Sequence, residues 1–374
     1  MRLVMALAGV SLLLVLVVTT VPGALQAGEV SQTSTYNSGY SLLSPIRSGN
    51  LTVFPVVAAK SFDTHEFLTL DEGLRSGDVV VTEAGQARGL IRRHSGRTPP
   101  IVEGGGAEVN RLVLVNNSTR PLLLLAGEIV TGGKQDRVIG KDRIVLPESD
   151  PVDLSVFCVE PGRWVGVSEK FENKLTAGLL ASPVVRSKAM AAKDQQQVWD
   201  SVRSSQLAMS ETVAVAGAPS ASAEVNQTTS YARVMDNKEV QKQVDAVAAP
   251  VERNYESVIR QLRDKNAVGV VVAVNGDIVW ADIFASTQLL QKYWPKLIRS
   301  YATEAVVTRA KGGQVALRDA EKFLDNLEAR HETADTEPGV YRQSERTGNG
   351  YKVFELTSLL PKTGFPVHIA KMAD

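Results

Sequence analysis

The segment AVGVVVAVNGDIVWADIF, residues 267–284, constrains the fold more than any other part of the sequence. Two apolar runs flank Asn275-Gly276, the dipeptide that best fits a tight type I′ turn between two strands. Ser286 then offers a helix N-cap, and the apolar residues that follow it recur at spacings of three and four. A buried hairpin followed by an amphipathic helix predicts a fold that mixes strands and helices.

The two halves of the chain differ in composition. Up to Trp164 the sequence is mostly strand-like, and we interpret RLVLVNNSTRPLLLL, residues 111–125, as a hairpin. Helical patterns then cover residues 171–180, 184–209 and 236–265, the last with a kink near Pro250. Further along, a helix at 319–330 precedes a C-terminal hairpin and one last strand. We therefore predict an α+β fold with a β-rich N-terminal half, a helical middle segment and a C-terminal hairpin-plus-helix part.

These patterns divide the chain into five segments. They are a signal peptide (1–27), a mobile lead-in (28–48), a β-rich motif-bearing domain that runs into helices (49–210), a flexible linker (211–234), and a helical and hairpin C-terminal part that packs on the first (235–374). The linker is built on Ala, Ser, Gly, Thr and Val and lacks a helical stripe.

The first residues have the features of an export signal. Arg2 supplies a positive start, residues 3–21 are almost wholly apolar, and residues 24–27 offer a small-residue cleavage site after Pro22-Gly23. We expect an exported protein, periplasmic or extracellular. The apolar run is also long enough to cross a thin bilayer, so tethering by an uncleaved N-terminal helix remains the alternative. No later stretch of the sequence is apolar enough to span a membrane.

Charge and cysteine content narrow the possible partners. Lys and Arg number 41 and Asp and Glu number 41, so no net charge draws the chain to nucleic acid or to anionic lipid. The single cysteine, Cys158, excludes an internal disulfide and alternates with apolar neighbours as a buried strand residue does. There is no HExxH motif and no paired-cysteine spacing, so we predict neither a metal site nor a cofactor.

Two short motifs carry most of the polar residues that suggest a site. GEIVTGGKQDR (127–137) and CVEPGRW (158–164) each follow an apolar, strand-like run and then gather Glu, Lys, Gln, Arg and Gly. We expect the two loops to fold beside each other and line one pocket for an anionic ligand. The residues predicted to bind it are Lys134, Gln135, Arg137, Arg163 and Trp164. The catalytic residues, if any, stay unknown, and the two candidates are Glu128 and Glu160.

The first motif is not a Walker loop. Glu128 occupies the position of the first glycine and Gln135 replaces the Ser or Thr that holds Mg²⁺, which excludes an ATPase of that type. The amides of Gly132 and Gly133 can still form an anion-binding nest. The alternative for both motifs is structural, with a tight turn, an ion pair between Arg163 and Glu160, and a packed tryptophan.

Taken together, the motifs resemble the ARPP family, the "ARG and rhodanese-phosphatase-superfamily-associated protein" domain. The resemblance rests on VNRLVLVNNSTRPLLLLAGEIVTGGKQDRV, CVEPGRW, QVWDSV and VGVVVAVNGDIVWADIF, together with SPIRSGNLTVFPVV, LTLDEGL and VTEAG. It covers nearly all of the mature chain in the family's order. The family's name refers to an association with ADP-ribosylglycohydrolase and phosphatase-type proteins, and the resemblance implies no particular reaction.

Two functions are consistent with the sequence. In the first, the protein binds a small anionic ligand, nucleotide-like or ADP-ribose-like, which Trp164 stacks on and the cations hold. In the second, it is a non-catalytic structural or interaction protein of the cell envelope, whose long helices bind a protein partner. Whether it is an enzyme, which ligand it takes and its oligomeric state are not determined by the sequence.

Overall fold

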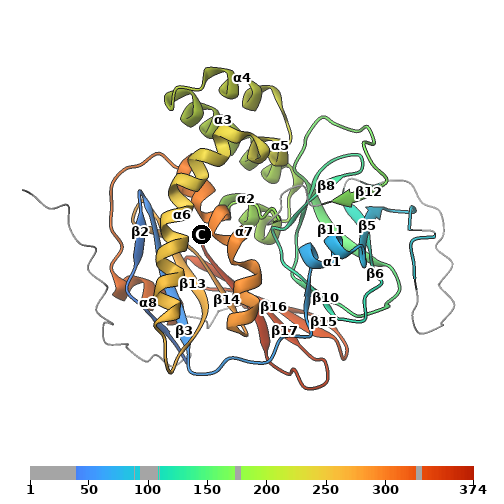
Figure 1. The fold of residues 1–374 in the computed structure, drawn as a ribbon. Helices are drawn as coiled ribbons and strands as arrows, with labels where there is room; N and C mark the ends of the chain where they lie inside the picture. Colours follow the sequence, from blue (N-terminus) through green and yellow to red (C-terminus); the bar gives the residue numbers. More distant parts are fainter. Residues whose placement is uncertain (1–38, 88, 93–107, 109, 173–177, 326–330) are drawn as a thin grey trace, which may run out of the picture.

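The computed structural model describes residues 39–87, 89–92, 108, 110–172, 178–325 and 331–374. Figure 1 shows two β-structures side by side, a small closed barrel and a larger antiparallel sheet. The barrel comes from the N-terminal half of the chain, and the sheet combines strands from both ends of the described chain. Helices of the middle segment join the two. The predicted α+β organisation, β-rich at the start and helical in the middle, is confirmed.

Six short strands close the barrel in the order β11-β6-β5-β12-β8-β9. In chain order they are β5 (Val79–Glu83), β6 (Arg111–Asn116), β8 (Ile129–Gly132), β9 (Arg137–Ile139), β11 (Val152–Cys158) and β12 (Lys170–Glu172). In β11, buried Leu154 and Val156 alternate with exposed Asp153 and Ser155, as expected for a strand with one face in a core. The inward side chains of the six strands fill the barrel and form its own hydrophobic cluster.

A three-stranded sheet beside the barrel corrects the hairpin predicted for residues 111–125. Its strands are β4 (Leu68–Thr69), β7 (Leu122–Leu124) and β10 (Arg143–Val145). β6 pairs with β5 and β11 in the barrel, whereas β7 pairs with β10 and β4. The carboxamide of Asn116 donates to the carbonyls of Arg120, Val145 and Leu146, at 2.9, 3.1 and 3.1 Å. Asn116 thus binds its own loop and the end of β10, and the chain leaves the barrel after β6.

The larger sheet has the order β1-β3-β13-β14-β18-β17-β16-β15, with β2 also paired to β3. Its strands are β1 (Tyr40–Leu42), β2 (Ile46–Ser48), β3 (Leu51–Ala58), β13 (Asn266–Val274), β14 (Asp277–Phe284), β15 (His331–Glu337), β16 (Tyr341–Thr347), β17 (Tyr351–Ser358) and β18 (Pro366–Ala373). The predicted hairpin of β13 and β14 is confirmed, with Asn275 and Gly276 at φ 57° and 87° in its turn. The C-terminal hairpin and last strand are also confirmed, as β16, β17 and β18.

The described end of the predicted lead-in, residues 39–48, is structured. It forms β1 and β2 along the edge of the sheet, where Leu42 and Ile46 are buried. Their burial outweighs the polar composition of the surrounding residues, from which a mobile segment was expected.

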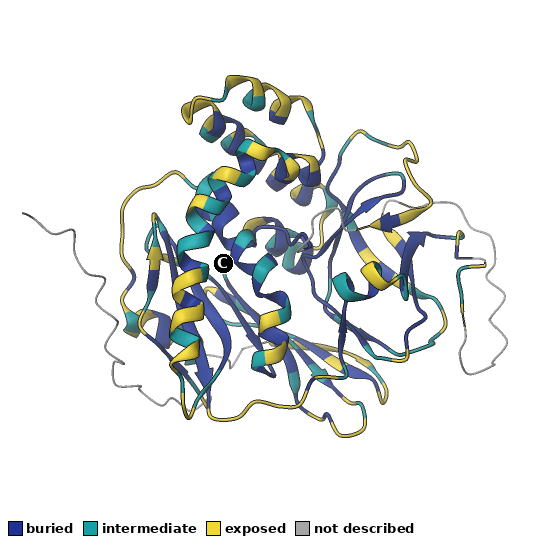
Figure 2. Ribbon diagram, in the orientation of Figure 1, coloured by how far each residue is buried: buried dark blue, intermediate teal, exposed yellow. Residues whose placement is uncertain are grey.

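Helices cover both faces of the central strands. α6 (Lys238–Arg260) and α7 (Thr287–Val307) pack on one face, and α8 (Leu317–Asp325) packs on the other. Along β13, Val270 and Val272 join the cluster under α6 and α7, whereas Val271 and Ala273 join the cluster under α8. Figure 2 shows these strands buried between helices whose outer sides are exposed. A strand that is buried on both faces has a continuous run of apolar residues, and β13 has such a run in the sequence.

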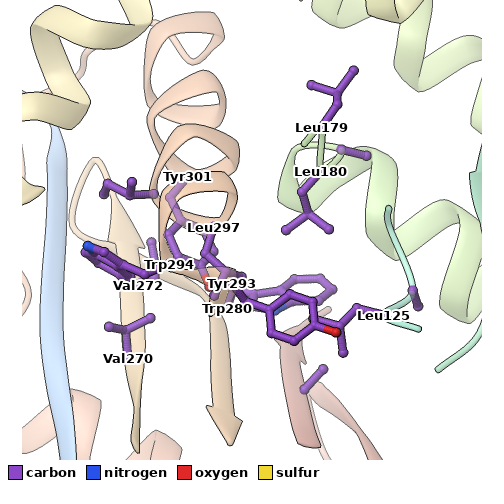
Figure 3. Packing of buried hydrophobic residues seen from close by; sticks show 14 of the residues in the cluster. Leu125, Leu179, Leu180, Val270, Val272, Trp280, Tyr293, Trp294, Leu297 and Tyr301 are labelled. Atoms are coloured by element: carbon purple, nitrogen blue, oxygen red, sulfur yellow. The ribbon is translucent and has the colours of Figure 1, made fainter. Parts of the chain in front are cut away.

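Helix α7 stands between the sheet and the barrel. Its predicted cap is confirmed, since the Ser286 hydroxyl accepts from the amide of Leu289 at 3.0 Å. Figure 3 shows Trp294 on the side of the sheet and Tyr293 on the side of Leu125. Trp294 stacks on Tyr255 of α6 with ring centres 4.1 Å apart, and the Tyr293 hydroxyl donates to a carbonyl in β7 at 3.0 Å. Helix α7 therefore ties the larger sheet to the three-stranded sheet beside the barrel.

The middle segment is helical over a longer stretch than predicted. Its elements are α2 (Pro183–Ser187), the π-helical turn η1 (Lys188–Ala192), α3 (Gln195–Val215), α4 (Pro219–Gln227) and α5 (Tyr231–Asp236). Most of 211–234, predicted as a flexible linker, thus lies in helices. Ser210 and Ser222 hydroxyls meet at 2.8 Å, and the Gln206 carboxamide donates to the carbonyl of Val225 at 2.6 Å. These polar bonds hold α3 against α4, and Met209, Val213 and Val225 of the two helices are buried in the main hydrophobic cluster.

Residues 171–180, predicted as a helix, do not form one where they are described. Phe171 and Glu172 belong to β12, and buried Phe171 fills the barrel. Leu180 forms an isolated bridge with Glu128, and residues 173–177 lie outside the described chain. Within the described ranges, no helix combines the length and the apolar character needed to cross a bilayer.

Candidate functional site

The two polar motifs lie at the same end of the barrel. β9 pairs with β11, and in that register Arg137 stands opposite Cys158 and Val138 opposite Phe157. The turn that precedes β9 and the loop that follows β11 are therefore neighbours. We call the side chains gathered there the loop cluster. Its members are Glu83, Lys134, Gln135, Asp136, Arg137, Cys158, Glu160, Arg163 and Trp164.

Arg163 fastens the two loops to each other. Its guanidinium donates to the carbonyls of Gly133 and Val165 at 3.0 and 2.8 Å and to the carbonyl of Gly132 at 3.3 Å. It also lies 2.5 Å from a carboxylate oxygen of Glu160. Charge-assisted bonds of this kind order a turn. The guanidinium of Arg163 is thus bonded to oxygens of the protein itself. Its ion pair with Glu160 is the one expected if the two motifs have a structural role.

The amides of the glycine turn also bind protein oxygens. Gly132 N donates to Asp136 at 3.0 Å, Gly133 N to Ser168 at 3.2 Å, and Lys134 N to a carboxylate oxygen of Glu83 at 2.7 Å. Gly133 adopts φ +49°, and a side chain there would collide with Phe171 and Glu83. The amides of the turn thus bind three separate oxygens of the protein, two from carboxylates and one from the Ser168 hydroxyl, and do not converge on one anion as in a nest.

Trp164 covers the two remaining cations of the cluster. Lys134 Nζ lies 4.9 Å and Arg137 Cζ 5.9 Å from the centre of its ring, while the ring itself stays 41% exposed. Arg137 is fully buried and donates to the backbone carbonyl of Gln135 at 2.7 Å. Burial lowers the pKa of Arg137, and the neighbouring Cys158 opposes that shift. Tryptophan faces attract cations, so these contacts stabilise the loop.

The charges of the loop cluster balance. Burial, and then the neighbouring Glu160, raise the pKa of Asp136, and burial raises the pKa of the Cys158 thiol. The three cations are Lys134, Arg137 and Arg163, and the three carboxylates are Glu83, Asp136 and Glu160. The cluster consequently presents no surplus of positive charge to an anion.

Glu128, the remaining candidate, lies at the other end of β8 and belongs to a different group. Its Oε1 lies 2.5 Å from Nζ of Lys296, and its Oε2 accepts from the amide of Leu125 at 2.7 Å. Lys296 Nζ also lies 2.5 Å from Asp71 of α1 (Leu70–Ser76) and 4.7 Å from the ring centre of Tyr293. Lys296, Asp71 and Glu128 form what we call the buried triad.

Burial sets the protonation behaviour of the buried triad. It raises the pKa of Glu128, an effect that Lys296 opposes and Asp71 reinforces. Burial alone would lower the pKa of Lys296, but Glu128 and Asp71 outweigh it and raise that pKa. The ammonium is therefore charged and fixed in position between two carboxylates that share it.

A cavity of about 220 Å³ adjoins the buried triad, between α6, α7 and residues 178–180. We call it the α6–α7 cavity. Its polar lining residues are Gln241, Lys296, Arg299, Ser300 and Thr303. Its apolar lining residues are Leu179, Leu180, Met235 and Val244, next to Gly178. Among the described residues that line it, two carry a positive charge and none carries a carboxylate. A concave, partly apolar space with a few convergent polar groups is the usual form of a small-molecule site.

Arg299 stands where the α6–α7 cavity meets the surface. Its guanidinium lies 2.6 Å from Asp245 of α6, with both side chains nearly half exposed. A pair this exposed contributes only about 0–1 kcal/mol to stability, so Arg299 is held loosely enough to turn toward a ligand. The Ser300 hydroxyl donates to the carbonyl of Ala181 at 2.6 Å and keeps its lone pairs as acceptors. The wall therefore offers cationic donors and hydroxyl oxygens together.

A second buried polar network joins the barrel to the sheet. His368 of β18 has Nδ1 2.6 Å from Asp142 and Nε2 3.1 Å from Asp282. Arg186 of α2 forks onto the Asp282 carboxylate at 2.9 and 3.1 Å, and the Tyr301 hydroxyl donates to the same group. Burial works against a charged ring, but Asp142 and Asp282 raise the pKa of His368 to about 9. These side chains are fully buried away from both sites and fasten the two parts of the fold.

No pattern in the sequence indicates that Lys296 or this network forms a buried cluster. The one available signal was a charged or ionisable residue within an apolar run, as for Asp282 in IVWADIF and His368 in PVHIA. Such residues are rarely buried unless paired, but a sequence does not show the partner. Among the described residues, no three His, Cys, Asp or Glu side chains are arranged to hold a metal ion.

A comparison of the sequence with protein-family models finds a match over most of the chain. A model of the ARG and Rhodanese-Phosphatase-superfamily-associated Protein domain matches residues 39–369, a range that includes the barrel, the helices and nearly all of the sheet. No curated protein and no solved structure matches the chain.

Proposed function

The chain belongs to the ARG and Rhodanese-Phosphatase-superfamily-associated Protein (ARPP) family, and we propose that it binds a small anionic molecule in the α6–α7 cavity. The observation that carries the proposal is that Lys296 and Arg299 line the same partly apolar cavity, whose described lining residues include no carboxylate. This moves the anionic ligand expected from the sequence away from the loop cluster and into a cavity whose two cations, although they pair with Asp71, Glu128 and Asp245, are the only charged groups among its described lining residues.

The size of the cavity limits the ligand. Pockets for drug-sized molecules have volumes of about 300–1,000 Å³, and the α6–α7 cavity has about 220 Å³. It suits a carboxylic acid or a sugar phosphate as a whole. A nucleotide or ADP-ribose would place only one end in it, with the rest outside near Arg299.

The roles of the lining residues follow from their surroundings. Asp71 and Glu128 hold the Lys296 ammonium in place, so no side-chain freedom is lost there when an anion arrives. Arg299 is mobile enough to close on the ligand from the surface. Leu179 and Val244 exclude water, which strengthens the attraction between the anion and the two cations.

Binding can be tested on the mature chain, residues 28–374, by thermal shift and calorimetry with inorganic phosphate, sugar phosphates, small carboxylic acids and nucleotides. Arg299→Gln should weaken the best ligand at least tenfold and leave the melting temperature nearly unchanged. Arg342→Gln is the matched control, because Arg342 forms an equally exposed pair with Glu332 on the hairpin of β15 and β16. Equal affinity in both variants would contradict the assignment of the site.

We propose further that the chain is exported. The support is the sequence of residues 1–27, with its positive start, apolar run and small-residue cleavage site. Cell fractionation followed by mass spectrometry of the N-terminal peptide tests this. A mature chain starting near Gly28 in the periplasm or the medium supports cleavage, and an intact Met1 peptide in the membrane fraction supports the tethered alternative.

One observation favours a second role, as an interaction protein of the cell envelope. Trp164, Val165 and Val167 expose large apolar surfaces on the loop after β11, at 41, 70 and 60%. Adjacent exposed apolar side chains are typical of contact surfaces. A photo-crosslinking amino acid at position 165 would trap a partner there. If nothing crosslinks and the acids bind, the ligand-binding role stands alone.

A further inference from the structure

A groove of about 490 Å³ lies between α3 on one side and α2, η1 and α7 on the other (Figure 1). We call it the α3 groove. It shares no described lining residue with the α6–α7 cavity. Its volume falls within the range of about 300–1,000 Å³ that is usual for drug-sized molecules. The side chains that matter in it are Val184, Lys188, Ser204, Ala208, Glu304 and Val307.

The side chains of the α3 groove can be reached from solvent. Val184, Asp200 and Ser204 are exposed, and Lys188 and Glu304 are half-buried. On α3 the lining residues recur at spacings of three and four, so they share one face of that helix. A ligand can therefore contact the charged groups of the groove without any rearrangement of the backbone.

Lys188 supplies an unpaired positive charge to the groove. Its ammonium forms neither an ion pair nor a hydrogen bond with any residue that the structure describes. It is the first residue of η1, a π-helical turn that ends at Lys193 with φ 52°. Turns of this kind are rare and occur frequently at functional sites. Lys188 is thus available to an anionic group in the groove.

Glu304 supplies the opposite charge and also lacks an ionic partner within the described ranges. Its Oε2 accepts from the amide of Val184 at 3.2 Å. Burial raises the pKa of Glu304, and the bond from Val184 opposes that shift. Because a cation nearby favours the charged form of a partly buried carboxyl group, an ammonium group that enters the groove would be held at Glu304.

The two unpaired charges lie about one helical turn apart. Val184, whose amide binds Glu304, precedes Lys188 by four residues along α2 and η1, and both side chains line the groove. One turn of helix rises about 5.4 Å. An α-amino acid carries its ammonium and its carboxylate on one carbon atom, so it can contact Glu304 and Lys188 at the same time. An amine or an acid alone would leave one of the two charges unpaired.

Apolar side chains line the rest of the groove. They are Val184 of α2, Ala208 of α3 and Val307 of α7. An aliphatic side chain placed among them removes apolar surface from water on both sides of the contact, which favours binding. The lining therefore suits an amino acid whose side chain is apolar.

We propose that the α3 groove binds a free α-amino acid with an apolar side chain, whose carboxylate pairs with Lys188 and whose ammonium pairs with Glu304. The side chain of the ligand packs against Val184, Ala208 and Val307. The proposal is independent of the anion site, because the two sites share no described lining residue and select different charges on the ligand.

The first test compares three probes on the mature chain by calorimetry or saturation-transfer NMR. They are leucine, 4-methylpentanoate, which lacks the ammonium group, and 3-methylbutylamine, which lacks the carboxylate. Leucine should bind at least tenfold more tightly than either of the other two, because it alone satisfies both charges. Equal binding of 4-methylpentanoate would contradict the contact with Glu304, and equal binding of the amine would contradict the contact with Lys188.

The second test uses variants. Lys188→Met should weaken leucine binding at least tenfold and leave the melting temperature nearly unchanged, because the lysine has no partner among the described residues. Lys265→Met is the matched control, since Lys265 is also half-buried and has no partner in the described chain, but lies outside the groove. Glu304→Gln keeps an acceptor for the Val184 amide and should also weaken leucine at least tenfold. Arg299→Gln, which weakens the anion site, should bind leucine as the wild type does.

The assignment is wrong if leucine does not bind at millimolar concentration, or if Lys188→Met binds it as tightly as Lys265→Met does. It is also wrong if Arg299→Gln removes leucine binding, a result that would place the amino acid in the α6–α7 cavity. If Glu304→Gln does not fold, the comparison of leucine with 4-methylpentanoate on the wild type still tests the ammonium contact.

Discussion

The Glu128 carboxylate lies 2.5 Å from the Lys296 ammonium, although the two residues are 168 positions apart in the sequence. The contact joins β8 of the barrel to α7, and α7 packs on the larger sheet. It also fixes the cation that lines the α6–α7 cavity. Fold and proposed function therefore depend on the same pair of side chains.

Removal of the cation from the buried triad should destabilise the protein strongly. Lys296→Met leaves the buried Glu128 carboxylate beside the partly buried Asp71 carboxylate without a counter-charge, a change that costs about 3–5 kcal/mol. Urea unfolding measures the loss. The double variant Lys296→Met/Glu128→Gln should recover part of it, because one of the two stranded charges is gone. A loss below about 1 kcal/mol in the single variant would mean that the triad is not buried as described.

The loop cluster should behave as a structural element. Arg163→Ala leaves the carbonyls of Gly132 and Gly133 and the Glu160 carboxylate without their donor, and should lower the free energy of unfolding by about 1–3 kcal/mol. Arg163→Lys should rescue little, since one ammonium cannot reach the same set of acceptors. Arg342→Ala, at an exposed pair, should stay within about 0.5 kcal/mol of wild type. Equal stability of Arg163→Ala and wild type would restore Arg163 as a free ligand-binding candidate.

The network of His368 predicts a pH dependence of stability. Its pKa is about 9 in the folded protein, above the ordinary value of 6.5 that it regains on unfolding. The folded state thus holds the extra proton, and its contribution is complete below pH ~6.5 and disappears as pH rises through about 9. The free energy of unfolding should fall across this window by up to ~1.4 kcal/mol per pH unit.

The control for that pH profile is His368→Gln, which should remove the slope. The difference between the two profiles isolates His368, because contributions of other groups cancel. Lys371 is one such group, whose pKa burial lowers to about 8. The quantity to compare is the free energy of unfolding of the wild type minus that of His368→Gln. If this difference stays constant or rises between pH 6.5 and 9, His368 is not held in its charged form.

Cys158 should be unreactive in the native protein. Its side chain is fully buried, and burial raises the pKa of its thiol. The thiolate is the reactive form, so iodoacetamide at pH 8 should modify almost no native protein and all of the urea-unfolded protein. Mass spectrometry distinguishes the two states. Rapid native labelling would indicate that the end of β11 opens readily.

Features that depend on local chemistry could be predicted from the sequence. The Asn275-Gly276 turn, the Ser286 cap and the apolar stripe of α6 follow from backbone and periodicity rules that act over a few residues. The elements that were predicted wrongly depend on contacts with residues far away in the sequence. Asn116 ends β6 because it reaches carbonyls of Val145 and Leu146, about thirty positions further on. No pattern around residue 116 reveals that contact.

The same distinction applies to the candidate site. The proximity of the two motif loops follows from their position at the ends of strands, and β9 does pair with β11. Glu128 belongs to the first motif in sequence but lies at the opposite end of β8, where Lys296 meets it. The charge balance of the loop cluster also required Glu83, which comes from β5 and lies outside the two polar motifs.

The decisive measurement for anion binding in the α6–α7 cavity is a crystal structure of the mature protein with the acid that binds best in calorimetry. We expect ligand density in the α6–α7 cavity, with an anionic oxygen within hydrogen-bond distance of Lys296 or Arg299. Density beside Trp164 and Lys134 instead, or a cavity that holds only water while the acid binds in solution, would contradict it.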